Sequence, residues 1–269
     1  MASLNLPVDP LSDLTNQSND TWNIIAVGHG RDNSDQRVIT TTAGVKELRV
    51  FYPKGSYCPS ATDAPQGGIG FYACPKTIFM ADDVTFSYQL YFHDSFNPVL
   101  GGKMPGLYVG PGTTSADVSG ASGGDHSKNS SFRVVWRANL VAEAYVYRPL
   151  HQDPAYNSIP NLVLNPTYGD SLWRGLFQFI KGSWNNVSVR IKVNSIVNGI
   201  AQPDGIVQLT INGVTETYNK MIWRTDNSHH VNAIVFDTFF GGSTNDWATP
   251  NDTWTYFRNM TVIRNSPHL

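Results

Sequence analysis

The chain is poor in charged residues, and it has no long hydrophobic run. Asp, Glu, Lys and Arg make up 15% of its 269 residues, and the net charge is −2. No global positive field therefore attracts a nucleic acid, and an acidic ligand would need a local cluster of Lys and Arg. No apolar stretch is long enough to cross a bilayer. These absences predict neither a nucleic-acid partner nor a membrane partner.

Cysteine is scarce as well, since Cys58 and Cys74 are the only two. They flank a segment rich in glycine and proline, PSATDAPQGGIGFYA. We expect a disulfide that closes this loop and contributes about 3 kcal/mol by loop entropy; the alternative is two independent thiols. The spacing fits no zinc ribbon, and the seven histidines show no metal-ligand spacing. We therefore expect no metal and no cofactor.

Sequons for N-glycosylation occur six times, at Asn16, Asn19, Asn129, Asn186, Asn251 and Asn259. Together with the low charge, they favour a secreted glycoprotein. The first ten residues, MASLNLPVDP, lack the apolar core of a signal peptide. We therefore expect an extracellular protein whose signal has been removed; the alternative is a protein that is not exported.

A sustained helical period is also missing, and short alternating runs take its place. Examples are VTFSYQLYF at 84–92, VSVRIKVN at 187–194 and GIVQLTIN at 205–212, separated by clusters of Gly, Pro, Asn and Ser. Asn212-Gly213 is a typical two-residue hairpin turn. The pattern predicts an all-β protein, an antiparallel β-sandwich of jelly-roll type. We expect a single domain over 21–269, with 1–20 as a loose leader or a first strand.

The stretch from Ser131 to Tyr147, SFRVVWRANLVAEAYVY, is typical of a β-hairpin. Ser131 and Arg133 on the first arm, and Tyr145 and Tyr147 on the second, are each spaced by two. Each pair therefore faces one side of its strand. A hydroxyl, a guanidinium and two phenols on one wall suit a site that holds an acidic sugar and moves its protons.

The two pairs share a face only if the turn has an odd number of residues. A loop of Ala138-Asn139-Leu140 puts Arg133 opposite Tyr145, and Ser131 opposite Tyr147. An even loop without a bulge separates the arginine from the tyrosines. We predict the odd loop. The alternative interpretation is an ordinary amphipathic hairpin with Tyr and Arg on a solvated face, because tyrosine is a favoured strand residue.

Six segments occur in one order that resembles polysaccharide lyase family 14, which includes alginate lyases and glucuronan lyases. They are GGKMPGLYVG, SFRVVWR, EAYVY, YGDSLWRGLFQF, SWNNVSVRIKVN and VFDTFFGGSTNDW, and the resemblance covers roughly residues 45–264. It implies a β-jelly roll, in agreement with the alternating strands. By motif it also implies catalytic roles for Lys103, Ser131, Arg133, Tyr145 and Tyr147.

Such a lyase removes the proton at C5 of a uronic acid and expels the oxygen at C4. A cation such as Arg133 or Lys103 is needed to offset the charge that develops beside the carboxylate. Tyrosine has a reference pKa of about 10, so a nearby cation is needed to favour the phenolate of Tyr145 or Tyr147 as base. Lys103 is the alternative base if its pKa is lowered. Ser131 is expected to hold a hydroxyl or a carboxylate of the substrate.

Four further residues are candidates for substrate binding. Arg137 and Arg148 are candidate subsite cations, or else exposed charges at strand ends. Phe240 and Trp247 lie near two glycines and are candidates for a stacking platform, with core packing as the alternative for the phenylalanine. Trp136 alternates with Arg137, so we expect it to point into the core.

The sequence therefore predicts a monomeric enzyme that cleaves a β-1,4-linked polyuronate, alginate or glucuronan, by β-elimination. An acidic polysaccharide is then the partner. A non-catalytic carbohydrate-binding jelly roll and a sandwich glycoside hydrolase are the alternatives. The hydrolase is disfavoured, because Asp82, Asp83, Asp125 and Asp237 form no obvious carboxylate pair.

Overall fold

The computed structural model describes residues 1–10, 22–112, 114, 118 and 124–266. Within these ranges the regular structure is almost entirely antiparallel strand, with four short 3₁₀ turns and no α-helix. The 3₁₀ turns are η1 (Lys76–Ile78), η2 (Ala138–Leu140), η3 (Pro154–Ser158) and η4 (Asn245–Trp247). None of the helical segments in the described part has the length and apolar character needed to cross a membrane.

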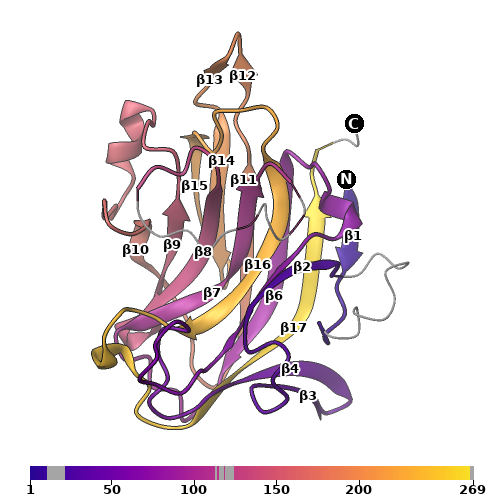
Figure 1. The fold of residues 1–269 in the computed structure, drawn as a ribbon, viewed down its shortest axis with the longest axis vertical. Helices are drawn as coiled ribbons and strands as arrows, with labels where there is room; N and C mark the ends of the chain where they lie inside the picture. Colours follow the sequence, from indigo (N-terminus) through magenta and orange to yellow (C-terminus); the bar gives the residue numbers. More distant parts are fainter. Residues whose placement is uncertain (11–21, 113, 115–117, 119–123, 267–269) are drawn as a thin grey trace.

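Two large sheets pack face to face (Figure 1). We call the first the back sheet; β1 (Ala2–Asn5) pairs with its β17. Its remaining strands are, in spatial order, β15 (Val214–Met221), β14 (Gly205–Ile211), β11 (Trp184–Lys192), β6 (Asp83–Phe92), β17 (Thr253–Arg264), β4 (Val45–Tyr52) and β3 (Arg37–Thr42).

The second sheet carries the site and is called the site sheet. Its order is β10 (Asp170–Gln178), β9 (Val141–Tyr147), β8 (Ser130–Arg137), β7 (Gly101–Gly110), β16 (His230–Phe240), β5 (Ile69–Ala73) and β2 (Ile24–His29). A small hairpin of β12 (Ile196–Val197) and β13 (Ile200–Ala201) projects beyond the sandwich (Figure 1). The predicted all-β sandwich of jelly-roll type is confirmed.

Alternation along the strands decides which face of each sheet enters the core. In β6, Val84, Phe86 and Leu90 are fully buried between the sheets, while Ser87 and Gln89 face outward. The back sheet thus has one apolar face and one polar face. Strand β8 is different, because both of its faces are buried. One face of β8 belongs to the core, so the other must lie under loops or in a cleft.

The hairpin turn at Asn212-Gly213 is confirmed between β14 and β15. Both residues have positive φ, 51° and 87°, as a two-residue turn that follows the twist of its strands requires. The prediction of a first strand within 1–20 is confirmed, and the alternative of a loose leader is wrong there, because Ala2–Asn5 pair with Arg264–Thr261 of β17 and Leu6 is buried. The rest of that prediction, over 11–20, lies outside the described residues.

The predicted disulfide is also wrong, because Cys58 and Cys74 are both free. Cys74 follows β5 and is buried, and its backbone N–H donates to the carbonyl of Asn23. Cys58 lies before the other end of β5 and borders a cleft. Five residues of extended strand span roughly 13 to 16 Å, so β5 carries the second cysteine away from the first.

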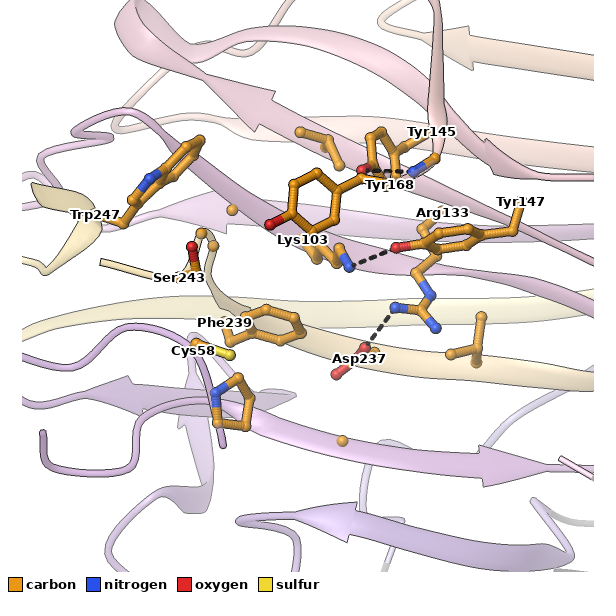
Figure 2. A pocket seen from close by; sticks show the side chains of 18 of the residues that line it. Cys58, Lys103, Arg133, Tyr145, Tyr147, Tyr168, Asp237, Phe239, Ser243 and Trp247 are labelled. Carbon is orange, nitrogen blue, oxygen red and sulfur yellow. Dashed lines mark hydrogen bonds and ion pairs between the residues drawn. The ribbon is translucent and has the colours of Figure 1, made fainter. Parts of the chain in front are cut away.

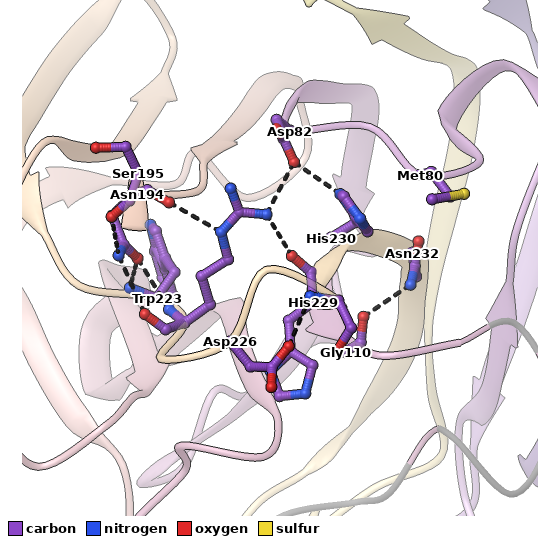
Figure 3. Close-up of polar contacts among 12 residues, drawn as sticks. Met80, Asp82, Gly110, Asn194, Ser195, Trp223, Asp226, His229, His230 and Asn232 are labelled. Carbon is purple, nitrogen blue, oxygen red and sulfur yellow. Dashed lines mark hydrogen bonds and ion pairs between the residues drawn. The ribbon is translucent and has the colours of Figure 1, made fainter. Parts of the chain in front are cut away.

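A polar cluster ties the two sheets together at one end of the sandwich (Figure 3). Asp82, just before β6, accepts hydrogen bonds from Arg224 at 3.1 Å and from His230 of β16 at 2.7 Å. The side-chain oxygen of buried Asn194 accepts from the backbone N–H groups of Trp223 and Arg224. His230 begins β16, so this cluster lies at the opposite end of that strand from the site described next.

Candidate active site

A cleft of about 930 Å³ lies on the face of the site sheet that points away from the core. All seven strands of the site sheet contribute residues to it, from β2 on one side to β10 on the other. Its floor includes Lys103 of β7, Arg133 of β8, Tyr145 and Tyr147 of β9, and Asp237 of β16 (Figure 2). Positive, phenolic and acidic groups thus share one wall.

The hairpin register brings the arginine and the tyrosines together, as predicted. Arg133 lies opposite Tyr145, and Ser131 lies opposite Tyr147. The connection is the expected three residues, Ala138–Leu140, in which Asn139 and Leu140 have positive φ. Trp136 points into the core and is fully buried, which confirms its predicted direction.

Lys103 belongs to a regular strand rather than to a loop. Strand β7 passes between β8 and β16, with Lys103 opposite Val135 on one side and Phe239 on the other. The strand fits there because its glycines leave room: a Cβ on Gly102 would lie 2.1 Å from the ring of Trp136, and one on Gly106 1.9 Å from the carbonyl oxygen of Phe132. The glycines around Lys103 therefore allow close approach of backbone and side chains.

Strand β16 supplies Asp237 and Phe239 to the cleft by simple alternation. Val235, Asp237 and Phe239 line the cleft, whereas Phe236 and Phe240 lie in the core. The prediction that Phe240 contacts substrate is wrong, because its ring stacks on Phe96 at 5.1 Å between the sheets. Phe239, the residue before it on the strand, occupies the cleft position that was expected for Phe240.

Lys103 is enclosed by aromatic rings. Its Nζ lies 5.4 Å from the ring centre of Tyr145, 5.6 Å from that of Tyr147 and 5.4 Å from that of Phe239. Burial and, next, the positive charge of Arg133 lower the pKa of Lys103 to about 7. Near neutral pH a large part of the Lys103 population therefore carries an unprotonated amine, which can accept a proton.

Arg133 is 3% exposed and is only partly satisfied. Its Nη1 donates to Asp237 at 3.1 Å. Its Nε and Nη2 are buried, and neither makes a hydrogen bond within the described part of the chain. An unsatisfied guanidinium edge in a cleft suits a carboxylate, which binds two such donors at once.

The two tyrosines lie beside Lys103 in a mutually perpendicular arrangement. Their ring centres are 5.5 Å apart. The hydroxyl of Tyr147 lies 3.5 Å from Lys103 Nζ, and that of Tyr145 accepts a hydrogen bond of 3.0 Å from the backbone N–H of Gly169. Burial raises the pKa of both phenols, although Arg133 opposes the change at Tyr147. Both therefore hold their protons near neutral pH and are suited to donate them.

His29 also lines the cleft, although no pattern in the sequence singles it out. It ends β2 opposite Gly70, where a Cβ would lie 2.4 Å from its ring. Its Nδ1 lies 3.8 Å from Asp237. Burial lowers the pKa of His29, so this imidazole is neutral near pH 7. Only the non-local pairing of β2 with β5 brings it here, and no local motif signals that pairing.

Of the remaining predicted residues, Arg137 and Trp247 line the cleft. Ser131 does not: it is 1% exposed and lies opposite Tyr108, which packs on Val118. Arg148 does not line it either, because it follows Tyr147 and leaves on the other side of the strand. It pairs with Asp170 at 2.6 Å. The predictions that Ser131 and Arg148 contact substrate therefore disagree with their positions.

The family model described as polysaccharide lyase 14 matches residues 40–260. The chain belongs to polysaccharide lyase family 14. This match spans every strand that contributes Lys103, Arg133, Tyr145, Tyr147 and Asp237. The cleft thus lies within the part of the chain that matches the family.

Solved structures with a similar fold agree with this assignment. The PL-14 alginate lyase of Aplysia kurodai is 30% identical, with a TM-score of 0.79 and 98% of each chain covered. Alginate lyase vAL-1 from Chlorella virus is 25% identical, with a TM-score of 0.76 and 98% and 99% of the two chains covered. The endo-β-1,4-glucuronan lyase of Trichoderma reesei, at 12% identity and a TM-score of 0.53, shares the fold.

A curated relative extends well beyond this chain. Exolysin of Paramecium bursaria Chlorella virus 1 is 25% identical over 202 residues, which are 70% of this chain and 30% of that protein. The chain therefore spans about a third of the length of this relative.

Membership of a lyase family favours a lyase over both alternatives, a binding protein and a glycoside hydrolase. The carboxylate on the cleft floor, Asp237, is engaged with Arg133 rather than placed as one of a hydrolytic pair. Across the described residues, no three of the His, Cys, Asp and Glu side chains gather in a way that could hold a metal ion.

Proposed function

We propose that this lyase acts on an acidic polysaccharide of uronic acids, with alginate as the first choice, and breaks it by β-elimination. The observation that carries the proposal is the unsatisfied edge of Arg133 beside the amine of Lys103 and the phenol of Tyr147. Two proteins of known structure at 30% and 25% identity are alginate lyases, which supports the choice of alginate.

Substrate binding begins at Arg133 in this proposal. The carboxylate of one uronate accepts hydrogen bonds from Nε and Nη2, which no described group occupies. Asp237 holds the third nitrogen and fixes the plane of the guanidinium. As negative charge moves onto the carboxylate during proton removal, this fixed cation stabilises it in a site shielded from water.

Lys103 then removes the C5 proton. Its amine is unprotonated in a large share of molecules near pH 7, because burial and Arg133 lower its pKa to about 7. The C5–H bond breaks, its electrons form the C4=C5 double bond, and the C4–O bond breaks. The departing oxygen takes a proton from a phenol, and Tyr147 is the assigned donor because burial keeps it protonated.

The 3.5 Å separation between Lys103 Nζ and Tyr147 Oη also resets the site. After the bond breaks, the lysine carries the extra proton and the tyrosine lacks one. Direct transfer from the ammonium to the phenolate restores both groups. The site thus needs no outside acid or base to complete the cycle.

Ultraviolet absorbance tests this function, because the new double bond is conjugated with the uronate carboxylate. The panel is alginate, polymannuronate, polyguluronate and glucuronan. We expect absorbance to rise on alginate and on at least one of its two homopolymers. Absence of a rise on every acidic polymer contradicts the proposal, and new reducing ends without absorbance indicate hydrolysis instead. A rise on glucuronan alone contradicts the choice of alginate.

We also propose that the enzyme acts outside the cell, where such polymers are found. Three of the predicted glycosylation sequons, at Asn186, Asn251 and Asn259, have exposed asparagines, which supports access for a glycan. Mass spectrometry of the secreted protein before and after deglycosylation measures this directly.

A further inference from the structure

A buried carboxylate next to the cleft holds two arginines that line it. Glu143 of β9 is fully buried. It accepts hydrogen bonds from Arg137 Nε at 2.9 Å, from Ser171 Oγ at 2.8 Å and from Arg174 Nε at 2.8 Å. Arg137, Ser171 and Arg174 all line the cleft, whereas Glu143 lies behind them. One carboxylate therefore fixes two cations on the wall of the cleft.

Strand β10 departs from regular geometry where it supplies Arg174. Leu172 lies opposite Ala144, so in an unbroken strand Trp173 would lie opposite Glu143 and face the cleft. Instead the register shifts after Leu172, and Trp173 takes a φ of 59°. Trp173 is 1% exposed in the core, and Arg174 takes its place over Glu143. The bulge thus exchanges a tryptophan for an arginine on the cleft face.

The unusual backbone at Trp173 is held by a neighbouring loop. The N–H of Trp173 donates to the carbonyl of Pro160, that of Arg174 donates to Asn161, and the side chain of Asn161 donates back to the carbonyl of Arg174. A bulky residue at positive φ costs about 1 to 3 kcal/mol. Such strain persists only where its surroundings hold it, and it gathers at functional sites.

The charges of this group do not cancel. Two guanidinium groups face one carboxylate, and the Arg137 and Arg174 side chains remain 22% and 41% exposed. Each uses Nε on Glu143, and Arg174 Nη2 donates to Ser171 at 3.0 Å. In the described part of the chain, neither Nη1 makes a hydrogen bond, so both can bind an anion. The excess positive charge favours a carboxylate there.

The group lies beside the reaction centre rather than within it. The guanidinium of Arg137 is 5.9 Å from the ring centre of Tyr145, and Lys103 Nζ is 5.4 Å from the same centre. The carboxylate of the reacting sugar already has Arg133. A second carboxylate site at this distance therefore suits a different sugar of the same chain.

We infer that Arg137 and Arg174 form a second carboxylate-binding subsite, for a uronate that neighbours the one losing its proton, and that Glu143 positions both arginines. This inference rests on the proposed function. Such a subsite makes the enzyme selective for polymers that carry carboxylates on consecutive sugars. The bulge of β10, which presents Arg174, then has a role in that selectivity.

Replacement of Arg174 tests the subsite. We expect Arg174→Gln to raise KM on the preferred polymer about tenfold, the loss of roughly one charge-assisted hydrogen bond, with kcat within threefold. Arg190→Gln is the matched control, because Arg190 pairs with Asp83 on the back sheet. Partial methyl esterification of the polymer removes carboxylates, so it should raise the KM of the wild-type enzyme. The difference in KM between the wild type and Arg174→Gln should become smaller.

Replacement of Glu143 tests the positioning role. Glu143→Gln should raise KM at least as much as Arg174→Gln does, and the double variant should be no worse than Glu143→Gln alone, because the arginine is already displaced. The side chain of Arg174 is partly exposed, so its variant folds even if Glu143→Gln does not. If the wild-type enzyme is active and Arg174→Gln has the same KM, the subsite is overturned and the proposed function stands. If the wild-type enzyme gives no rise in ultraviolet absorbance on any acidic polymer, the proposed function is overturned.

Discussion

Burial shifts the pKa values of Lys103 and Tyr147 in opposite directions, and this separation supports the roles proposed for them. It lowers the pKa of the lysine to about 7 and raises that of the phenol. The sequence suggested that a nearby cation would favour a phenolate base. The structure differs, since burial outweighs Arg133 at Tyr147. The lysine is thus the better base, which was the alternative that the sequence left open.

The dependence of kcat/KM on pH follows from this assignment. The active amine is unprotonated, so kcat/KM should rise about tenfold per pH unit below pH 7 and level off above it. The raised pKa of Tyr147 keeps the acid protonated over the same range. Burial lowers the pKa of His29, so this histidine titrates on the acid side of the midpoint that Lys103 sets at about pH 7.

Initial rates at low substrate concentration between pH 5 and 10 measure that profile. A midpoint near 10, the ordinary value for lysine, contradicts the neutral-amine base. A value of kcat/KM that falls as the pH rises from 6 to 8 also contradicts the neutral-amine base.

Prediction from sequence succeeded at the residue level where strict alternation applied. Arg133, Tyr145 and Tyr147 share a face because one odd loop fixes their register. The prediction for Phe240 was wrong by one position on β16, because nothing in the run VFDTFF indicates which set of alternating residues faces the core. Arg174 could not be predicted to lie over Glu143, because the bulge at Trp173 reverses the alternation.

At the scale of elements, β7 is the strand on which the site depends most. It lies between β8 and β16 and carries Lys103 between Val135 and Phe239. The two glycines directly before Lys103 are visible in the sequence, in the segment GGKMPG. These glycines permit close packing against Trp136 rather than a turn. That role depends on residues far along the chain, so it emerges only in the folded sheet.

Substitution of Gly102 by alanine tests this packing. The new Cβ would lie 2.1 Å from the ring of Trp136 and 2.3 Å from the carbonyl oxygen of Phe239, so the strand must shift. We expect the free energy of unfolding to fall by at least about 2 kcal/mol, with a loss of activity as Lys103 moves.

Gly28→Ala is the control for stability, because its Cβ would meet its nearest atom at an ordinary 3.4 Å. Chemical denaturation of both variants gives the comparison. Equal stabilities would contradict the close-packing role of Gly102.

At the scale of the whole molecule, the two sheets divide the tasks of the fold. The back sheet is polar on its outer face and apolar on its inner face, so it closes the core. The site sheet is buried on both faces at β8, with core on one side and the cleft on the other. The cluster around Asp82 ties the sheets at the far end of β16 (Figure 3). The site therefore stands on a sheet whose other face packs into the core, which holds the side chains in place for proton transfer over short distances.

The rate of double-bond formation in variants of the two central residues tests the account most directly. Lys103→Ala and Tyr147→Phe should each lower the rise in ultraviolet absorbance on the preferred polymer by about a hundredfold or more. Lys192→Ala and Tyr91→Phe, both on the back sheet, are controls that should stay within about twofold of the wild type. Near-normal rates in both central variants, with folding intact, would contradict the roles of Lys103 as base and Tyr147 as acid.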